Sequence, residues 1–168
     1  MSVSSRKTPR KAAAEPAGRP RTRIQARNRA TILEAALEVF SAHGFRGATL
    51  DQIATEANLS KPNLLYYFAS KEAIHVALLS RLMTTWLEPL EMLREDGAPV
   101  DEILAYVRRK LEMSRAYPRE SRLFANEIVQ GAPRIIDQIE GPLRDLVEEK
   151  AALIGRWQAE GRLAAIDP

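Results

Sequence analysis

Apolar residues recur at helical spacing along nearly the whole chain, and no segment has the alternating pattern of a β-strand. Near the N-terminus, this spacing predicts a helix over residues 28–43, with Gly44 as its expected end. Beyond residue 69 it predicts longer helices over residues 70–94, 101–117, 119–130 and 134–160, with Gly141-Pro142 as a candidate break in the last. We therefore expect an all-α fold.

Residues 49–72 contain two short amphipathic helices joined by a tight turn. Thr49 and Gln52 have the spacing of a capping box at the start of the first helix. Ser60 is the next N-cap, and the helix that follows it is only about two turns long. Because so short a helix is unstable alone in water, we expect it to be docked on its neighbours and used for its outward face. This is the arrangement of a helix-turn-helix, whose second helix enters the DNA major groove.

The second short helix is expected to have one buried and one DNA-facing side. Helical spacing assigns Leu64, Leu65 and Phe68 to the buried side. Consecutive helical positions diverge by about 100°, so at least one of the two adjacent tyrosines must be exposed, even if the other is a half-buried packing residue. The outward side chains that we expect to contact DNA are Lys61, Asn63, Tyr66 and Tyr67.

This part of the chain resembles the DNA-binding head of the TetR family of bacterial transcriptional repressors. The similarity runs from about residue 28 to residue 72, and it includes Gly44-Phe45, Ile53-Ala54 and Ser60-Lys61. It implies a three-helix head at residues 23–69, joined by a long helix to a helical body at residues 70–168 that binds an effector and dimerises. Many family members have histidine where this chain has Tyr67, so the contact made there is expected to differ.

The resemblance also implies an effector for the body. Within the family, the segments SKPNLLYYFASKEA and TWLEPL are similar to regulators of pyrimidine use, which implies uracil or thymine. Trp86 would be a wall of the cavity, with Phe124 as a second wall and Glu127 as a polar anchor that needs a hydrogen-bonding partner if it is buried. The alternative for a tryptophan on an apolar stripe is a core position, which is our expectation for Trp157.

Family members usually continue with two further helices that pair across a homodimer and help to close the effector cavity. The body is therefore expected to be incomplete at residue 168, and a homodimer is expected where those helices are present. The alternative is a DNA-binding protein that lacks ligand control.

Positive charge is concentrated at the N-terminus. Residues 1–29 contain nine Lys or Arg and one Glu, a net charge of +8, whereas residues 30–168 have a net charge of −5. Residues 1–22 are expected to form a disordered basic tail, which is either simply solvated or an electrostatic arm for DNA. Arg23, Arg27 and Arg29 lie nearest the first helix and are the expected phosphate contacts.

Two more polar residues, Thr49 and Lys71, join Lys61 and Asn63 as candidate contacts to the double-stranded DNA operator. Thr49 can offer its hydroxyl or N–H to a phosphate, or it can act as a cap alone. Lys61 and Lys71 lie at helix starts, where a cation opposes the helix dipole; a bound phosphate would relieve that conflict, and the alternative is a solvated lysine. The Asn63 amide can pair with adenine or contact a phosphate.

Several other classes of protein have no support in the sequence. The absence of cysteine excludes disulfides and thiolate metal sites and suits a reducing cytoplasm. No apolar run approaches the ~18 residues that a membrane span needs. His43 and His75 have no carboxylate or cysteine at ligand spacing, and there is no Gly-rich phosphate loop, so we expect no catalytic residue, metal or cofactor. The remaining rival is an all-α interaction protein, or a membrane-surface protein, that uses the basic arm alone.

Overall fold

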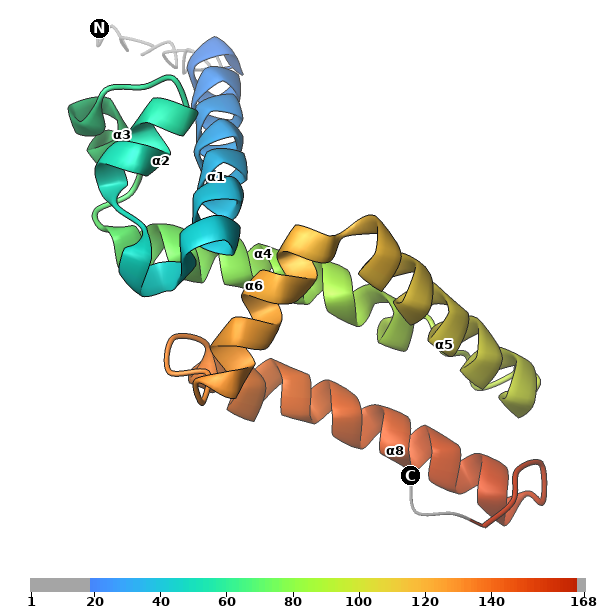
Figure 1. Cartoon of the computed structure of the whole chain (residues 1–168). Coiled ribbons are helices and arrows are strands. Elements are labelled where there is room, and N and C mark those ends of the chain that lie inside the picture. Colours follow the sequence, from blue (N-terminus) through green and yellow to red (C-terminus); the bar gives the residue numbers. More distant parts are fainter. Residues whose placement is uncertain (1–18, 166–168) are drawn as a thin grey trace, which may run out of the picture.

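The computed structural model describes residues 19–165, and within that range it contains helices and no strand (Figure 1). The all-α class is therefore confirmed for the described residues. No helix in this range is long and apolar enough to cross a membrane. The elements are α1 (Arg19–Gly47), α2 (Leu50–Glu56), α3 (Lys61–Tyr67), α4 (Lys71–Glu91), α5 (Pro99–Ala116), α6 (Pro118–Val129), α7 (Ile136–Gln138), the π-helical turn η1 (Ile139–Leu143) and α8 (Arg144–Ala159).

The helices form a compact head and a more open body. Figure 1 places α1, α2 and α3 together at one end, while α4 leads from them into the region of α5, α6 and α8. Helix α6 crosses over α4 and also packs against α1, so the body contacts the head through a second helix besides α4. A shift of α6 can therefore reach the head directly.

Helix α1 is longer than the sequence pattern predicts. It starts at Arg19, nine residues before the expected start, so the prediction that residues 1–22 form a tail is wrong for residues 19–22. The other residues of that tail, 1–18, lie outside the described residues. At Gly44, where we expected the helix to end, the backbone leaves the helical range (φ 65°, ψ 175°), so the continuous helix ends there and a short second segment reaches Gly47. Arg23, Arg27 and Arg29 thus lie on a helix that continues into the core of the head.

The short helices α2 and α3 have the predicted caps. Thr49 Oγ1 accepts a hydrogen bond from the Gln52 N–H at 3.2 Å, and Gln52 Oε1 accepts one from the Thr49 N–H at 2.8 Å, so the capping box is present. Ser60 Oγ accepts from the Asn63 N–H at 3.3 Å at the start of α3. These bonds occupy helix-end N–H groups that have no partner within the helix.

The core of the head lies between α1 and the two short helices. Ile32 and Phe40 of α1 are fully buried with Leu64 of α3, and Phe68 is 3% exposed. Leu65 was predicted to be buried, and that is wrong because it is 39% exposed. A helix of two turns can bury only one narrow stripe against its neighbours, and Leu64 with Phe68 already fills it.

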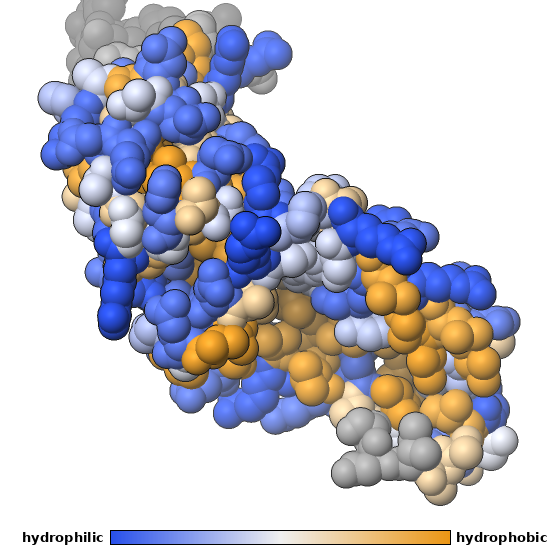
Figure 2. Space-filling view, in the orientation of Figure 1, coloured by the Kyte–Doolittle hydropathy of each residue, from blue (hydrophilic) through white to orange (hydrophobic). Residues whose placement is uncertain are grey.

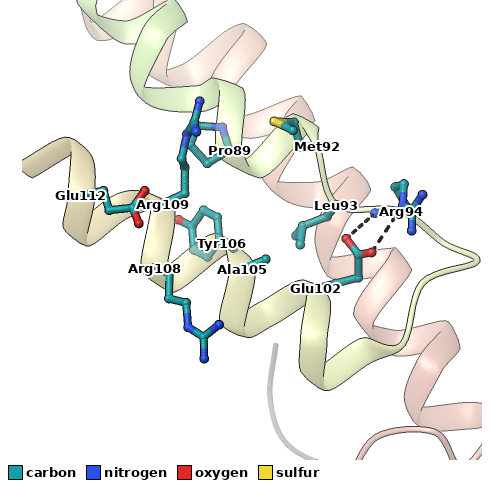
Figure 3. Close-up of a pocket in the computed structure, with 10 residues that line it drawn as sticks. All are labelled: Pro89, Met92, Leu93, Arg94, Glu102, Ala105, Tyr106, Arg108, Arg109 and Glu112. Carbon is teal, nitrogen blue, oxygen red and sulfur yellow. Dashed lines mark hydrogen bonds and ion pairs between the residues drawn. The ribbon is translucent and has the colours of Figure 1, made fainter.

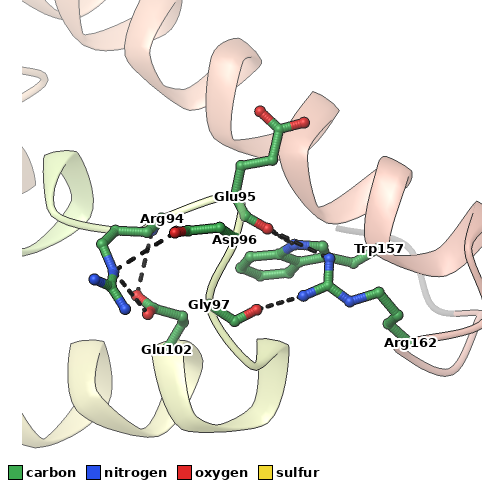
Figure 4. A network of polar contacts seen from close by, with 7 residues as sticks. All are labelled: Arg94, Glu95, Asp96, Gly97, Glu102, Trp157 and Arg162. Atoms are coloured by element: carbon green, nitrogen blue, oxygen red, sulfur yellow. Dashed lines mark hydrogen bonds and ion pairs between the residues drawn. The ribbon is translucent and has the colours of Figure 1, made fainter.

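The body has a second, smaller core near its far end. Trp157 of α8 is fully buried there with Leu93, which confirms the expected core position of this tryptophan. Its indole Nε1 donates to the Glu95 carbonyl at 3.1 Å, and Arg162 donates to the Gly97 carbonyl (Figure 4). The loop between α4 and α5 is thereby fastened to the end of α8.

Hydrophobic side chains are more exposed on the body than on the head. Figure 2 shows a mostly hydrophilic head, whereas hydrophobic residues gather on the face of the body between α5 and α8. The apolar stripe of α5 contributes to this surface, since Leu104 is 45% and Leu111 60% exposed. The helix predicted over residues 101–117 is therefore present as α5, with its apolar face only partly packed.

The predicted break in the last helical segment is present. Gly141 has φ −108° and ψ −105°, outside the helical range, and Pro142 follows it inside the π-helical turn η1. The segment expected as one helix over residues 134–160 therefore consists of α7, η1 and α8.

His75 of α4 is a core residue of the junction between head and body. Its side chain is 2% exposed and lies edge-on to Phe40 and Phe45, at centroid distances of 4.7 and 4.9 Å. Burial lowers the pKa of His75 from 6.5 to about 4; nearby Glu127 opposes this, and the cations Arg134 and Lys71 add to it. The imidazole is therefore neutral at neutral pH.

Protonation of His75 should destabilise the folded chain. Because the pKa is lower when folded, the neutral imidazole contributes its full stability above about pH 6.5, and this is lost as the pH falls toward about 4. In urea unfolding, we expect the free energy of unfolding of His75→Leu to fall less between about pH 7 and about pH 4.5 than that of the wild type, by about 2–3 kcal/mol. The exposed His43, changed to Gln, is the matched control. Equal pH dependence in wild type and His75→Leu would contradict this account.

Candidate nucleic-acid interface

Helix α3 presents a short, polar face to solvent. Its buried stripe rests on the head core, and Lys61 and Asn63 in its first turn are exposed. Tyr66 near its end is 69% exposed, which is unusual for so large a ring. Of the residues predicted to face DNA from this helix, Lys61, Asn63 and Tyr66 are therefore exposed, whereas Tyr67 is half-buried.

The two adjacent tyrosines differ in exposure, as their divergence along the helix requires. Tyr67 is half-buried, and its hydroxyl accepts a hydrogen bond from Asn28 Nδ2 at 2.8 Å. The Tyr66 hydroxyl accepts a longer bond from Gln25 Nε2 at 3.3 Å. The two rings meet edge to face with their centroids 5.1 Å apart, so the exposed Tyr66 ring packs against the Tyr67 ring, which is bonded to α1.

Arg29 contacts the end of α3, a contact that the sequence pattern did not indicate. Its Nη1 donates to the Tyr67 carbonyl at 3.1 Å, and its guanidinium lies 4.1 Å from the centre of the Phe68 ring. These residues are almost forty positions apart, and no periodic signal connects them. By contrast, the side chains of Arg23 and Arg27 are exposed, and neither has a hydrogen bond or ion pair to another residue of the described part of the chain.

The two lysines at helix starts have protein partners that relieve their conflict with the helix dipole. Lys61 Nζ lies 2.9 Å from Asp51 Oδ2, an exposed ion pair between α3 and α2. Lys71 Nζ donates to the carbonyls of Phe45 and Ala48 at 2.7 and 2.8 Å, next to the end of α1. A phosphate is thus not needed to explain either position, and contact of these two lysines with DNA remains a prediction, as it does for Thr49.

The three candidate effector residues lie in the body but have different surroundings. Trp86 and Phe124 are partly buried and pack against the main core. Lys110 Nζ lies 5.0 Å from the centre of the Trp86 ring and donates to the Trp86 carbonyl at 3.1 Å. Burial lowers the pKa of this lysine.

Glu127 has the partner that a buried carboxylate needs. It is 3% exposed, and its Oε2 lies 2.9 Å from Arg134 Nη1, while its Oε1 accepts from the Arg134 N–H at 3.0 Å. The Arg134 guanidinium in turn lies 3.8 Å from the centre of the Phe45 ring, at the end of α1. Glu127 therefore links α6 to the head, so an effector would have to compete with Arg134 for it.

A groove of about 530 Å³ lies between the end of α4 and α5 (Figure 3). Its lining includes Pro89 and Met92 from the α4 side and Tyr106 and Arg109 from α5. Trp86, Phe124 and Glu127 do not line it. The volume is within the range of small-molecule sites. Of the lining residues, Pro89 lies in the segment TWLEPL, whereas Met92, Tyr106 and Arg109 lie outside the segments singled out in the sequence.

Two family models together match residues 32–168. Residues 32–78 match "Bacterial regulatory proteins, tetR family", and residues 79–168 match "YcdC-like protein, C-terminal region", a model of the C-terminal part of TetR-type regulators. The first covers the helices of the head from the core of α1 onward, including the face of α3. The second covers more than half of the chain.

Curated relatives agree with these matches. The chain is 50% identical to the HTH-type transcriptional regulator RutR of Escherichia coli (strain K12) over 148 residues, which are 88% of this chain and 70% of that protein. It is 36% identical to the HTH-type transcriptional repressor NicS of Pseudomonas putida over 78 residues, 46% of this chain and 37% of the relative. These relatives are regulators, not enzymes.

The fold is similar to that of solved regulators. A TetR-like transcriptional regulator from Rhodococcus sp. RHA1 superposes with a TM-score of 0.67 at 23% identity, over 80% of this chain and 73% of that one. A TetR family transcription regulator from Marinobacter aquaeolei VT8 has a TM-score of 0.68 at 19% identity, over 84% and 73%. The chain belongs to the TetR family of transcriptional regulators, with a helix-turn-helix DNA-binding head.

Proposed function

We propose that this regulator is a repressor that binds a palindromic operator as a homodimer in the cytoplasm and leaves it when a pyrimidine such as uracil or thymine binds the body. The observation that carries the DNA-binding part is the accessible face of α3, a two-turn helix that is docked at both ends. The identity of 50% to RutR supports the effector part. Two copies would place one recognition helix in each half-site, about one helical turn apart.

Base reading is assigned to the exposed side chains of α3. Tyr66 and Asn63 project from the part of the helix that would enter the major groove, and an amide at this place can pair with adenine. The Tyr67 hydroxyl accepts from Asn28, which leaves its own O–H and the ring edge for contact with DNA. Arg23, Arg27, Lys61 and Thr49 would contact phosphates on either side, which positions the head without reading sequence.

The link from effector to operator would run through α6. This helix carries Phe124 and Glu127, and it packs against α1. Arg119 at its start bonds Glu38 at 2.6 Å and Glu34 at 3.1 Å, and Glu127 near its end holds Arg134 against Phe45. A pyrimidine that prefers one placement of α6 would bias the position of both heads, and only this difference in affinity can drive release.

The DNA contacts can be tested with a duplex selected from a random library. We expect Tyr66→Ala to lower affinity for the selected duplex about tenfold and for random DNA less than about twofold, because it removes a base contact. Lys61→Ala should weaken both and reduce the salt slope by about 0.9 for each phosphate that the lysine neutralises. The measurement is fluorescence anisotropy over a salt series.

Arg108→Ala is the matched control for the removal of a positive charge, because Arg108 is exposed on α5, far along the chain from the head. It should leave affinity and salt slope unchanged. Equal losses on all sequences for Tyr66→Ala would show that this tyrosine does not read bases, and a wild type without any sequence preference would contradict the proposed function.

The effector can be tested by titration calorimetry with uracil and thymine, and with adenine as a purine control. We expect pyrimidine binding to weaken in Trp86→Phe, which keeps an apolar ring but loses stacking area. Because coupling between sites is reciprocal, saturating operator DNA should weaken pyrimidine binding by the same factor by which the pyrimidine weakens operator binding, typically ~5–150-fold. Absence of heat with both pyrimidines, or equal affinity with and without operator, would contradict the assignment.

A further inference from the structure

We propose that Asn28 and Arg29 are positioning residues that fix the recognition helix α3, and that Arg29 acts there rather than on a DNA phosphate. The inference rests on the proposed DNA-binding function and assigns operator specificity in part to the N-terminal portion of α1. Asn28 and Arg29 are consecutive on α1, and both bond Tyr67, the last residue of α3.

The first contact is at the C-terminal end of α3. The last carbonyls of a helix have no partner within it, and they form the negative end of its dipole. Arg29 Nη1 donates to one of them, that of Tyr67, at 3.1 Å. A cation at this end is favourable, and in a helix of seven residues the few end groups are a large share of all its hydrogen-bonding groups.

The second contact fixes the guanidinium in one place. It lies 4.1 Å from the centre of the Phe68 ring, and Phe68 is itself 3% exposed in the head core. The planar guanidinium can stack on this ring while its N–H groups reach the Tyr67 carbonyl, which an ammonium group cannot do in the same way. Arg29 therefore joins the end of α3 to the core.

The third contact extends this support to the DNA-facing surface. The Asn28 amide donates to the Tyr67 hydroxyl at 2.8 Å, and this bond limits rotation of the ring. The Tyr67 ring meets that of Tyr66 edge to face at 5.1 Å. Tyr66 is the exposed side chain, so Asn28 influences it through Tyr67 without contact with DNA.

The part of α1 that carries Asn28 and Arg29 is held in place by the head core. Within the next two turns of α1 after Arg29, Ile32 and Ala36 are fully buried in the head core. A small rotation of a two-turn helix moves its outward side chains relative to the base edges, and a misplaced side chain loses its hydrogen bonds steeply with angle. Loss of the Asn28 and Arg29 contacts should therefore reduce discrimination between sequences more than general DNA affinity.

The salt slope separates positioning from phosphate binding. A cation that binds a phosphate releases counterions, so its removal lowers the slope by about 0.9 for each phosphate that it neutralises. We expect Arg29→Gln to lower affinity for the selected duplex about five- to tenfold, the equivalent of one hydrogen bond, with random DNA changed less than about twofold and the slope unchanged. Arg27→Gln is the matched comparison, because Arg27 is exposed and its side chain has no bond to a described residue. This substitution should lower the salt slope.

Arg29→Lys is an independent test of positioning against phosphate binding, because it keeps the positive charge. A positioning role predicts that lysine, which lacks the planar fork, still shows a loss of specificity, whereas a phosphate contact predicts nearly wild-type binding. Equal losses on all sequences with a lower slope in Arg29→Gln, or full rescue by lysine, would overturn the inference while leaving the regulator's function intact. A wild type with no sequence preference would instead refute the proposed function.

The Asn28 contact can be tested with a double-mutant cycle. Asn28→Ala and Tyr67→Phe each remove the same hydrogen bond, so the double variant should lose no more specificity than either single variant. Thermal melting of each variant without DNA measures any change in the stability of the head separately. Additive losses of specificity would show that the two residues act independently, which would contradict the positioning role of Asn28.

Discussion

The function of the head depends on the docking of α3, because a helix of seven residues is not stable alone in water. Leu64 is its buried anchor, Ser60 caps its start, and Arg29 occupies a carbonyl at its end. The exposed face has only solvent-accessible contacts within the head, such as the Lys61–Asp51 ion pair, and pairs of this kind contribute little to stability. The extension of α1 back to Arg19 places Asn28 and Arg29 inside the helix rather than at its end.

Helix α6 is linked to the head by exposed ion pairs at its start and by a buried ion pair at its end, and the buried pair is the stronger link. The pairs of Arg119 with Glu34 and Glu38 are about half exposed on both sides, and pairs of this kind contribute about 0–1 kcal/mol. The pair of Glu127 and Arg134 is buried, and removal of one partner from such a pair typically costs about 3–5 kcal/mol. Arg134 also contacts Phe45, so the end of α6 is the firmer link to the head.

Local signals in the sequence were sufficient for most of the fold. The capping box at Thr49 and the break at Gly141 are encoded in neighbouring residues, and both are present. The start of α1 was missed because residues 23–27 are exposed or half-buried, so no buried apolar stripe marks this part of the helix. The partners of Arg29 and Lys71 were missed because they come from distant elements, and charge alone suggested phosphates.

Hydrogen exchange measured by mass spectrometry, with and without the selected operator duplex, tests the central claim most directly. If α3 is the DNA-reading helix and α1 supports it, the amides of residues 61–67 and of the first turns of α1 should exchange more slowly in the complex, whereas those of α5 should be unchanged. Slower exchange confined to the body, or no change in α3 at saturating DNA, would contradict the account.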